Sequence, residues 1–330
     1  MVYKFSLVMK IDILVPQYRE TEEVIRPLLD SIATQQNVDF ENVGVIICND
    51  GTDVLLDEEF LSRYPYEITY IKGEHRGVSA TRNACLDASK ADYVMFCDAD
   101  DMFYHNCALW FINREMEIGF DTLMSAFFEE GRHPETREPL YITHQTDSTF
   151  VHGKVHRRKF LVENNIRFNP DLTIHEDSYF NILCQQIAPP DRAKYCQIPF
   201  YIWRWRDDSV CRHDPKYILK TYRNMLDSND ALICQFLKRG MKEKAREFVS
   251  MMVYDTYYLF NKPEWKEQEN QEYKQLTEER FRAYYKKFND LWNDTPKEVK
   301  MVISNGIRQR SIQEGMEMEN ITLGDWLSNF

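Results

Sequence analysis

Compact apolar runs and amphipathic segments alternate along the first 130 residues of the chain. Runs rich in aliphatic, β-branched and aromatic residues predict strands at 10–15, 42–48, 67–72 and 92–97. Helices are predicted between them, at 21–35, where apolar side chains recur at helical spacing, and at 77–89. This alternation predicts an α/β, Rossmann-like fold in which helices flank a mostly parallel sheet. Ligands of such sheets bind at the carboxyl ends of the strands.

The pattern changes after residue 128. Further elements are predicted as a loop or hairpin at 129–148, helices near 158–165 and 177–186, and one or two strands at 194–205. From about residue 215 to 292 the chain is amphipathic and helical, with breaks near Gly240 and Pro263. A helical C-terminal region is therefore expected, with a role in packing or oligomerisation.

Composition narrows the class of protein. The 330 residues are 43% hydrophobic, which allows a large core, and they carry a formal net charge of −12. The acidic balance argues against non-specific binding to nucleic acid or to an anionic membrane, because such binding depends on basic surface. The eight cysteines form no C-x-x-C pair, which favours a reducing compartment. No apolar stretch reaches the roughly 20 residues of a membrane span and no signal peptide is evident, so a cytoplasmic location is expected.

Polar residues gather directly after the predicted strands. Asp98 and Asp100, one residue apart behind an apolar strand, can hold a divalent cation that bridges phosphate oxygens. The competing interpretation is that these acids cap the N-terminus of a helix, where aspartate is also favoured. Other polar clusters follow strands at 16–20 and 49–53, and the cluster 77–84 begins a helix.

Four motifs in this order resemble the family 2 glycosyltransferases, whose nucleotide-sugar-binding domain is called the GT-A fold. The motifs are Pro16-Gln17-Tyr18, Asn49-Asp50-Gly51-Thr52, Thr81-Arg82-Asn83 and Asp98-Ala99-Asp100-Asp101. Asn49 departs from the family pattern, which has aspartate at that position. The resemblance continues through 154–158, 165–168, Glu176-Asp177 and 201–204 with Ser209, and it covers about residues 10 to 213.

The resemblance implies an inverting transfer from a UDP-sugar donor, assisted by Mn²⁺ or Mg²⁺. It assigns the donor pocket to Pro16, Tyr18, Glu20, Asp50, Arg82, Asp98 and Ala99. Tyr18 would stack on the base, Asp50 would accept the N–H of the uracil ring, and Arg82 would pair with phosphate or base. Asp98 would address the ribose or bridge to the metal through water. The alternative for Arg82 is an exposed residue on a helix surface.

The same resemblance assigns the metal and the base. Asp100 is the first-choice metal ligand, His213 would complete the metal site, and His175 is the competing histidine. Asp177 is implied as the general base that takes the acceptor proton, while Glu176 would orient a hydroxyl group. The alternative for these two acids is that they stabilise the N-terminus of the helix that follows them.

The acceptor side is assigned to Trp203, Arg206 and Ser209, which would contact the acceptor or phosphate. The tryptophan has a competing interpretation as a core residue. The acceptor is a hydroxyl group, most simply on a cell-surface or phage-related glycopolymer, with a protein side chain or a modified DNA base as alternatives. We expect residues 1–213 to form the catalytic domain, with 1–105 binding the nucleotide and 106–213 serving the acceptor and base.

Residues 214–330 are expected to serve packing, homo-oligomerisation or acceptor binding. Two other functions stay open at this point. A nucleotidyltransferase would carry a glycine-rich phosphate loop after the first strand, which 16–20 is not. A non-catalytic nucleotide-binding or scaffold protein could share the fold, because fold does not imply function.

Overall fold

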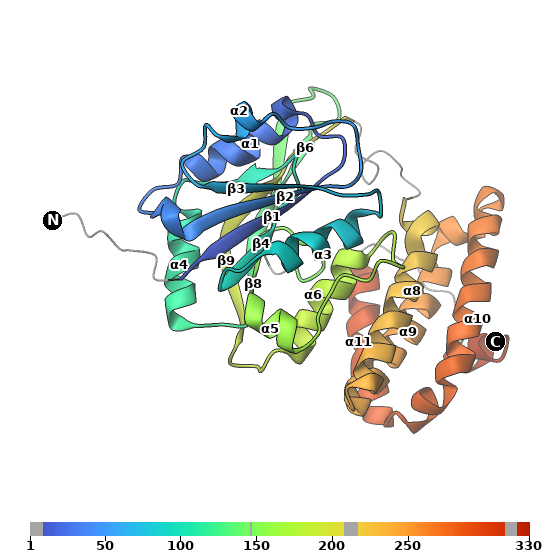
Figure 1. Ribbon diagram of the computed structural model, residues 1–330. Helices are drawn as coiled ribbons and strands as arrows, with labels where there is room; N and C mark the ends of the chain where they lie inside the picture. The colour runs from blue at the N-terminus through green and yellow to red at the C-terminus, as the bar shows by residue number, and fades with distance from the viewer. Residues whose placement is uncertain (1–8, 146, 208–216, 314–321) are drawn as a thin grey trace. The chain divides into compact units, whose positions relative to one another are not determined.

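The computed structural model describes residues 9–145, 147–207, 217–313 and 322–330 (Figure 1). The chain divides into two compact units, Met1–Ser209 and Val210–Phe330. The domain boundary expected after residue 213 stays a prediction, because 208–216 lie outside the described residues.

The first unit is built on a nine-stranded sheet with the order β3-β2-β1-β4-β8-β6-β9-β5, in which β7 pairs with β6. Its first half contains β1 (Ile11–Gln17), β2 (Val43–Asn49), β3 (Glu67–Lys72) and β4 (Tyr93–Phe96). All pairs among these strands are parallel, as the sequence predicts. Their carboxyl ends therefore meet at one edge of the sheet.

The second half of the sheet is mixed. It contains β5 (Met102–Phe103), β6 (Thr122–Arg132), β7 (Pro139–His144), β8 (Lys154–Arg157) and β9 (Ala193–Trp203). Strand β8 runs antiparallel to both β4 and β6, whereas β6 and β9 are parallel. The turn-rich stretch 129–148 forms a hairpin between β6 and β7. The α/β fold is thus confirmed, with its parallel pairing concentrated in the first half of the sheet.

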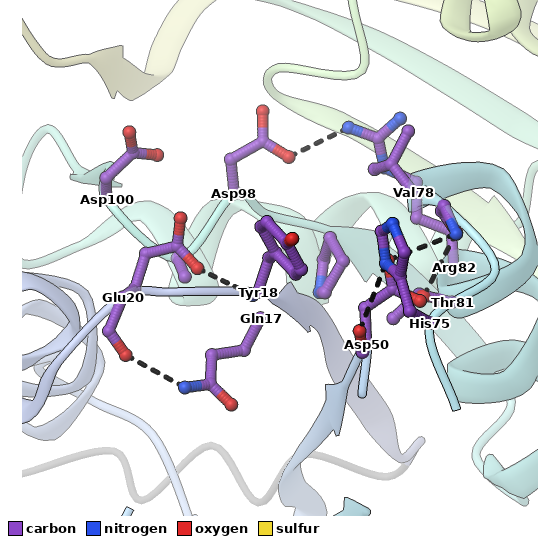
Figure 2. Close-up of a pocket in the computed structure, with 13 residues that line it drawn as sticks. Gln17, Tyr18, Glu20, Asp50, His75, Val78, Thr81, Arg82, Asp98 and Asp100 are labelled. Carbon is purple, nitrogen blue, oxygen red and sulfur yellow. Dashed lines mark hydrogen bonds and ion pairs between the residues drawn. The ribbon is translucent and has the colours of Figure 1, made fainter. Parts of the chain in front are cut away.

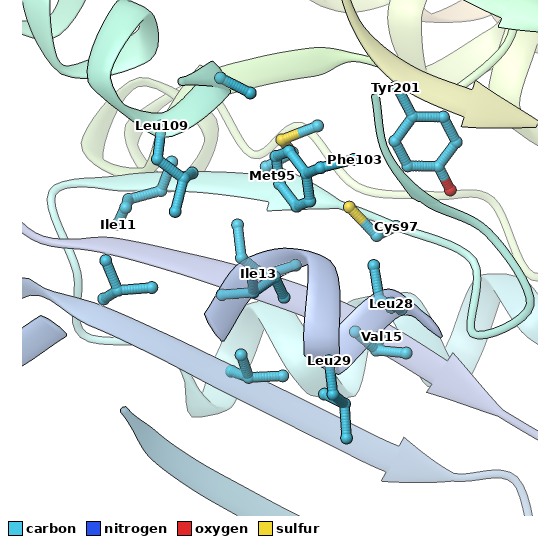
Figure 3. Packing of buried hydrophobic residues seen from close by; sticks show 14 of the residues in the cluster. Ile11, Ile13, Val15, Leu28, Leu29, Met95, Cys97, Phe103, Leu109 and Tyr201 are labelled. Atoms are coloured by element: carbon cyan, nitrogen blue, oxygen red, sulfur yellow. The ribbon is translucent and has the colours of Figure 1, made fainter. Parts of the chain in front are cut away.

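Helices cover both faces of the sheet (Figure 1). They are α1 (Glu22–Ala33), α2 (Glu58–Leu61), α3 (Val78–Ala88), α4 (Ala108–Ile118), α5 (Arg158–Glu163) and α6 (Glu176–Ile187), with a 3₁₀ turn at Phe40–Asn42. Because side chains alternate along a strand, Ile13 and Val15 of β1 share one core with α1 and α4 (Figure 3). On the other face, Phe96 of β4 packs against Phe168 and Phe180, the latter from α6.

The second unit is helical, as the sequence predicts. It contains α8 (Tyr217–Lys238), α9 (Lys242–Phe260), α10 (Gln271–Asp294), α11 (Lys297–Gln313) and α12 (Leu323–Leu327), with 3₁₀ turns at Pro263–Lys266 and Gln268–Asn270. The predicted breaks near Gly240 and Pro263 both separate helices. Its core includes the buried Trp265, Phe281 and Trp326. Among the described residues, no helix combines the length and apolarity needed to cross a bilayer.

Candidate active site

A pocket of about 360 Å³ opens where β1, β2 and β4 end and α3 begins (Figure 2). It is lined by Pro16, Gln17, Tyr18, Glu20, Asp50, His75, Gly77, Val78, Thr81, Arg82, Asp98, Ala99 and Asp100. All seven residues assigned to the donor pocket are among them, as is the first-choice metal ligand Asp100. The strand-end clusters of the sequence therefore come together in one place.

The pocket is acidic. Four carboxylates line it, on Glu20, Asp50, Asp98 and Asp100, together with the guanidinium of Arg82, and a second guanidinium, that of Arg206, lies 3.1 Å from Asp100 Oδ2. Carboxylate oxygens are the ligands that Mg²⁺ and Mn²⁺ prefer. An anionic pyrophosphate would be repelled here unless a cation entered with it. The lining thus suits a divalent cation that is shared with phosphate groups.

Beneath the pocket, a buried polar network explains why asparagine stands at position 49. The Asn49 amide donates hydrogen bonds to Gln17 Oε1 at 2.9 Å and to the Val54 carbonyl at 3.1 Å. Gln17 in turn donates to the carbonyls of Glu20 and Val54 and accepts from Tyr70 Oη. A carboxylate at position 49 could not donate these bonds. The departure from the family pattern is therefore matched by its local partners.

Asp50 organises the loop that precedes α3. Its carboxylate accepts hydrogen bonds from the backbone N–H of Arg76 at 2.8 Å and of Gly77 at 3.1 Å, and it contacts His75 Nδ1 at 2.9 Å. The His75 ring stacks on Tyr18 with ring centres 4.9 Å apart (Figure 2). His75 was not predicted, because it lies three residues after the end of β3, outside the strand-end clusters of the sequence, and belongs to no recognised motif. The contact of Asp50 with uracil stays a prediction.

Arg82 lies at the centre of the site and is 4% exposed, so the interpretation as a surface residue is wrong. Its Nη2 donates to Asp98 Oδ1 at 2.8 Å and its Nη1 donates to Glu176 Oε1 at 2.9 Å. Burial disfavours the charge on Arg82, but these two carboxylates outweigh it and raise the pKa of the guanidinium. One guanidinium thus joins the end of β4 to the start of α6.

The segment 98–101 is tied to the end of β9. Asp98 N donates to Tyr201 Oη at 2.9 Å, and that hydroxyl donates to Asp101 Oδ2 at 2.7 Å. Asp101 also accepts from the backbone N–H of Arg204 at 2.8 Å. Burial, together with Asp100 and Asp98, raises the pKa of the Asp101 carboxyl well above its usual range. Asp101 therefore fixes the loop, while Asp98 and Asp100 face the pocket.

A second donor set lies just below this loop. Asp98, Asp101 and His152 place one ligand atom each within 4.8 Å of one another. His152 is buried, its Nδ1 has no hydrogen-bond partner, and burial lowers the pKa of its imidazole to about 3. A neutral imidazole with an orphaned nitrogen beside two carboxylates fits a divalent metal. His152 was missed because it lies in a turn without a motif.

Of the two histidines predicted as metal ligands, the structure describes only His175. His213 and the acceptor residue Ser209 lie outside the described residues. His175 is the N-cap residue of α6 and has a left-handed backbone conformation, with φ of 64°. The metal assignments of both histidines stay predictions.

Glu176 and Asp177 occupy the first turn of α6. Glu176 is held by Arg82, and Asp177 Oδ1 accepts a hydrogen bond from Ser178 N at 2.7 Å. Burial and the neighbouring Glu176 carboxylate raise the pKa of Asp177 to about 7. A carboxylate with that pKa exchanges protons near neutral pH, as a general base must. Their place in the helix also stabilises negative charge, so capping and catalysis are compatible here.

The two described acceptor-side residues have distinct environments. Trp203 ends β9 and packs against Phe150 and His152, each with ring centres 5.3 Å away. Tyr201 stacks on the same His152 ring, so Tyr201 and Trp203 share one face of β9, as the alternation predicts. Arg206 lies instead at the pocket, with Nη1 3.1 Å from Asp100 Oδ2.

Comparison with known proteins finds a family profile and several glycosyltransferases that resemble this chain. The sequence profile of the family described as Glycosyl transferase family 2 matches residues 12–169. The Minor teichoic acid biosynthesis protein GgaB of Bacillus subtilis (strain 168) is 28% identical over an alignment of 229 positions that covers 62% of this chain. The chain spans only 23% of the length of GgaB. The Putative glycosyltransferase EpsH of the same strain is 24% identical, over 78% of this chain and 77% of EpsH.

Among solved structures, S. aureus TarS residues 1–349 in complex with UDP-GlcNAc aligns with a TM-score of 0.57. The alignment covers 91% of this chain and 92% of that one, at 18% sequence identity. At this identity the likeness establishes the fold. The GT-A fold expected from the motifs, with its helical C-terminal region, is confirmed.

Proposed function

We propose that the chain is a glycosyl transferase of family 2, whose profile matches residues 12–169, and that it transfers a sugar from a UDP-sugar to a hydroxyl group of a cell-surface glycopolymer, with inversion at the anomeric carbon. The donor class is supported by the UDP-GlcNAc bound to TarS. The acceptor class is supported by GgaB, which is named for teichoic acid biosynthesis. The match to the family profile favours glycosyl transfer over nucleotidyl transfer.

The observation that carries this proposal is the double ion pair of Arg82. Its guanidinium bonds Asp98, on the donor side, and Glu176, the neighbour of Asp177. The side chain is buried, so the two pairs are shielded from water and hold their geometry. The donor carboxylates and the proposed base thus belong to one constellation, although 94 residues separate Arg82 from Glu176.

The pocket is proposed to bind the donor as a metal complex. Asp100 and Asp98 would hold Mn²⁺ or Mg²⁺, which stabilises the negative charge that develops on the leaving diphosphate. Tyr18, backed by the His75 ring, offers an aromatic face for the base. Asp50 keeps that face in place through its bonds to the loop at 75–77.

The chemical step is a single displacement. The acceptor oxygen forms a bond to the anomeric carbon while the bond from that carbon to the UDP oxygen breaks. Asp177 takes the proton of the acceptor hydroxyl as this happens, a role that contributes about 10²–10⁴-fold to rate. Its raised pKa makes it a stronger base than an ordinary aspartate. Glu176 stays paired with Arg82 and positions the start of α6.

Asp177→Asn tests this assignment. Asparagine keeps the oxygen that accepts from Ser178 N but loses the basicity, so the helix start is preserved. We expect turnover with a UDP-sugar and a teichoic-type acceptor to fall by at least about 10²-fold, with UDP affinity within a few-fold of wild type. The matched variant is Glu176→Gln. Near-normal turnover in Asp177→Asn, with Glu176→Gln inactive, would move the base by one residue.

A further inference from the structure

Arg206 forms an ion pair with Asp100, the carboxylate that we expect to bind the divalent cation. Its Nη1 lies 3.1 Å from Asp100 Oδ2 and 3.8 Å from Glu20 Oε1. The side chains of these three residues are 32%, 30% and 22% exposed. The guanidinium therefore neutralises two of the four pocket carboxylates in this state.

The backbone just before this arginine is anchored. Arg204 donates its N–H to Asp101 Oδ1 and its Nη1 to the Asp100 carbonyl, at 2.8 and 3.1 Å. Trp205 N donates to Glu130 Oε2 at 3.0 Å. The segment is thus fixed beside the loop at 98–101, while the long side chain of Arg206 can change rotamer at the pocket mouth.

Arg82 provides the contrast. Its side chain is 5% exposed and is bonded by two carboxylates, so moving it would leave buried charges uncompensated. Arg206 is partly exposed and loses less when its pair opens, because water can solvate the separated charges. Of these two arginines, Arg206 is therefore the one that can be exchanged for another cation.

A divalent cation bound to Asp100 would compete with the guanidinium of Arg206 for this carboxylate. Both would be bound by one carboxylate, where their like charges would repel. The pyrophosphate of the donor brings new anionic oxygens, for which a planar guanidinium is a favoured bidentate partner. When nucleotide and metal are both present, Asp100 pairs with the metal and Arg206 with the diphosphate, so both side chains regain a partner of opposite charge. With metal alone, Arg206 loses its pair to Asp100 and gains no new partner from the ligand.

We propose that Arg206 is the resident counter-ion of Asp100, which the divalent cation displaces and which then pairs with the diphosphate of the donor. This inference rests on the proposed metal-dependent donor binding. Arg206 becomes the link between two ligands: it opposes metal binding in the empty enzyme and favours it once nucleotide is present. Such a link is a coupling free energy, and it is reciprocal between metal and nucleotide.

Calorimetric titration of Mn²⁺ into the full chain, with and without UDP, tests the exchange in Arg206→Gln. Removing the competitor should tighten Mn²⁺ binding without nucleotide by at least about threefold. The ratio of the Mn²⁺ Kd without UDP to that with UDP should fall by about tenfold relative to wild type. Unchanged or weaker Mn²⁺ binding by the variant alone, with the ratio preserved, would overturn the exchange.

Two further variants keep the result interpretable. Arg137→Gln removes the same charge from a side chain that is 60% exposed and pairs with Asp207, one residue from Arg206, and it should bind Mn²⁺ within about twofold of wild type. Arg206→Lys keeps the positive charge, so it should bind Mn²⁺ alone as wild type does. A lysine variant that instead behaves like the glutamine variant would contradict charge competition.

The same titrations separate this inference from the proposed function. If wild type binds no Mn²⁺ with or without UDP, metal-dependent donor binding itself fails, and the exchange falls with it. If wild type shows strong coupling that Arg206→Gln leaves intact, only the exchange is overturned. Thermal unfolding of each variant shows whether the fold is retained.

Discussion

Asp177 gives the protein a titration near neutral pH. Burial and Glu176 raise the pKa of its carboxyl to about 7, and only the deprotonated form can accept the acceptor proton. We therefore expect kcat to rise with pH, to reach half its maximum near pH 7, and to level off above it. Turnover at saturating donor between about pH 5.5 and 8.5 measures this limb. In Asp177→Asn the residual kcat should no longer rise across this pH range. If the rise persists, another group is responsible for it.

At the scale of single residues, the sequence predicts side chains that belong to motifs and misses those that owe their place to tertiary packing. Asp98 and Asp100 are found because they follow a predicted strand, and Arg82 is found because it belongs to the motif 81–83 on a predicted helix. His75 joins the site through Asp50, 25 residues away, and no local pattern encodes that contact. His152 is buried between Phe150, two residues before it, and Tyr201, which comes from the distant strand β9. Its neutral state follows from burial, which the sequence does not display.

At the scale of elements, the turn after β2 and the start of α3 depend on glycine for different reasons. Gly51 has φ of +69°, and a Cβ there would overlap the backbone of His75 and lie 2.7 Å from the carbonyl carbon of Glu74. Gly77, at the start of α3, has φ of +86°, but a Cβ there would meet nothing within 4 Å. Strain alone thus acts at position 77, whereas strain and collision act together at position 51.

The two alanine variants separate these effects. We expect Gly77→Ala to lower the free energy of unfolding by about 1–3 kcal/mol with UDP affinity within about threefold of wild type. Gly51→Ala should be less stable still and should lose at least about tenfold in UDP affinity, because the loop carrying His75 must move. Urea unfolding and calorimetry with UDP and Mn²⁺ measure both. Equal UDP affinities in the two variants would show that the close approach at Gly51 does not position the pocket.

Regular elements with a clear pattern are predicted well. β3 has the predicted bounds, and α3 and α6 differ from prediction by one residue at each end. β8 was not predicted, because Lys154 and His156 make its four residues look polar. Both side chains are buried, and Lys154 is stabilised by Asp147 at 3.3 Å, a tertiary contact invisible to local pattern. Strand β8 pairs antiparallel with both β4 and β6, and its absence from the prediction is one reason why a mostly parallel sheet was expected.

At the scale of the whole molecule, the sequence predicts a catalytic α/β part and a helical part, but it assigns the helical part no chemistry. The residues lining the donor pocket lie between Pro16 and Asp100, all within the unit Met1–Ser209. The unit Val210–Phe330 has its own buried aromatic core. Its proposed role in oligomerisation stays a prediction. The division into two units predicts that a substitution in the core of the helical unit lowers the stability of that unit and leaves the affinity for the donor unchanged.

Trp326 offers the test of that separation. Its ring packs within 4.8 Å of Phe330, 5.1 Å of Phe281 and 5.5 Å of Tyr257, measured between ring centres, and it is 9% exposed. Trp326→Ala removes this packing and should destabilise the helical unit by about 3–5 kcal/mol. The exposed Met301→Ala is the control, with an expected effect within about 0.5 kcal/mol.

Urea unfolding followed by circular dichroism should show the loss in the Trp326 variant as an earlier transition of part of the helical signal. Calorimetry in the absence of urea should still find UDP and Mn²⁺ affinities within about twofold of wild type, because the pocket side chains that the structure describes all belong to the unit Met1–Ser209. A tenfold loss of UDP affinity in Trp326→Ala, with Met301→Ala unaffected, would mean that donor binding depends on the helical unit. The C-terminal helices would then be part of the donor-binding machinery rather than a separate module.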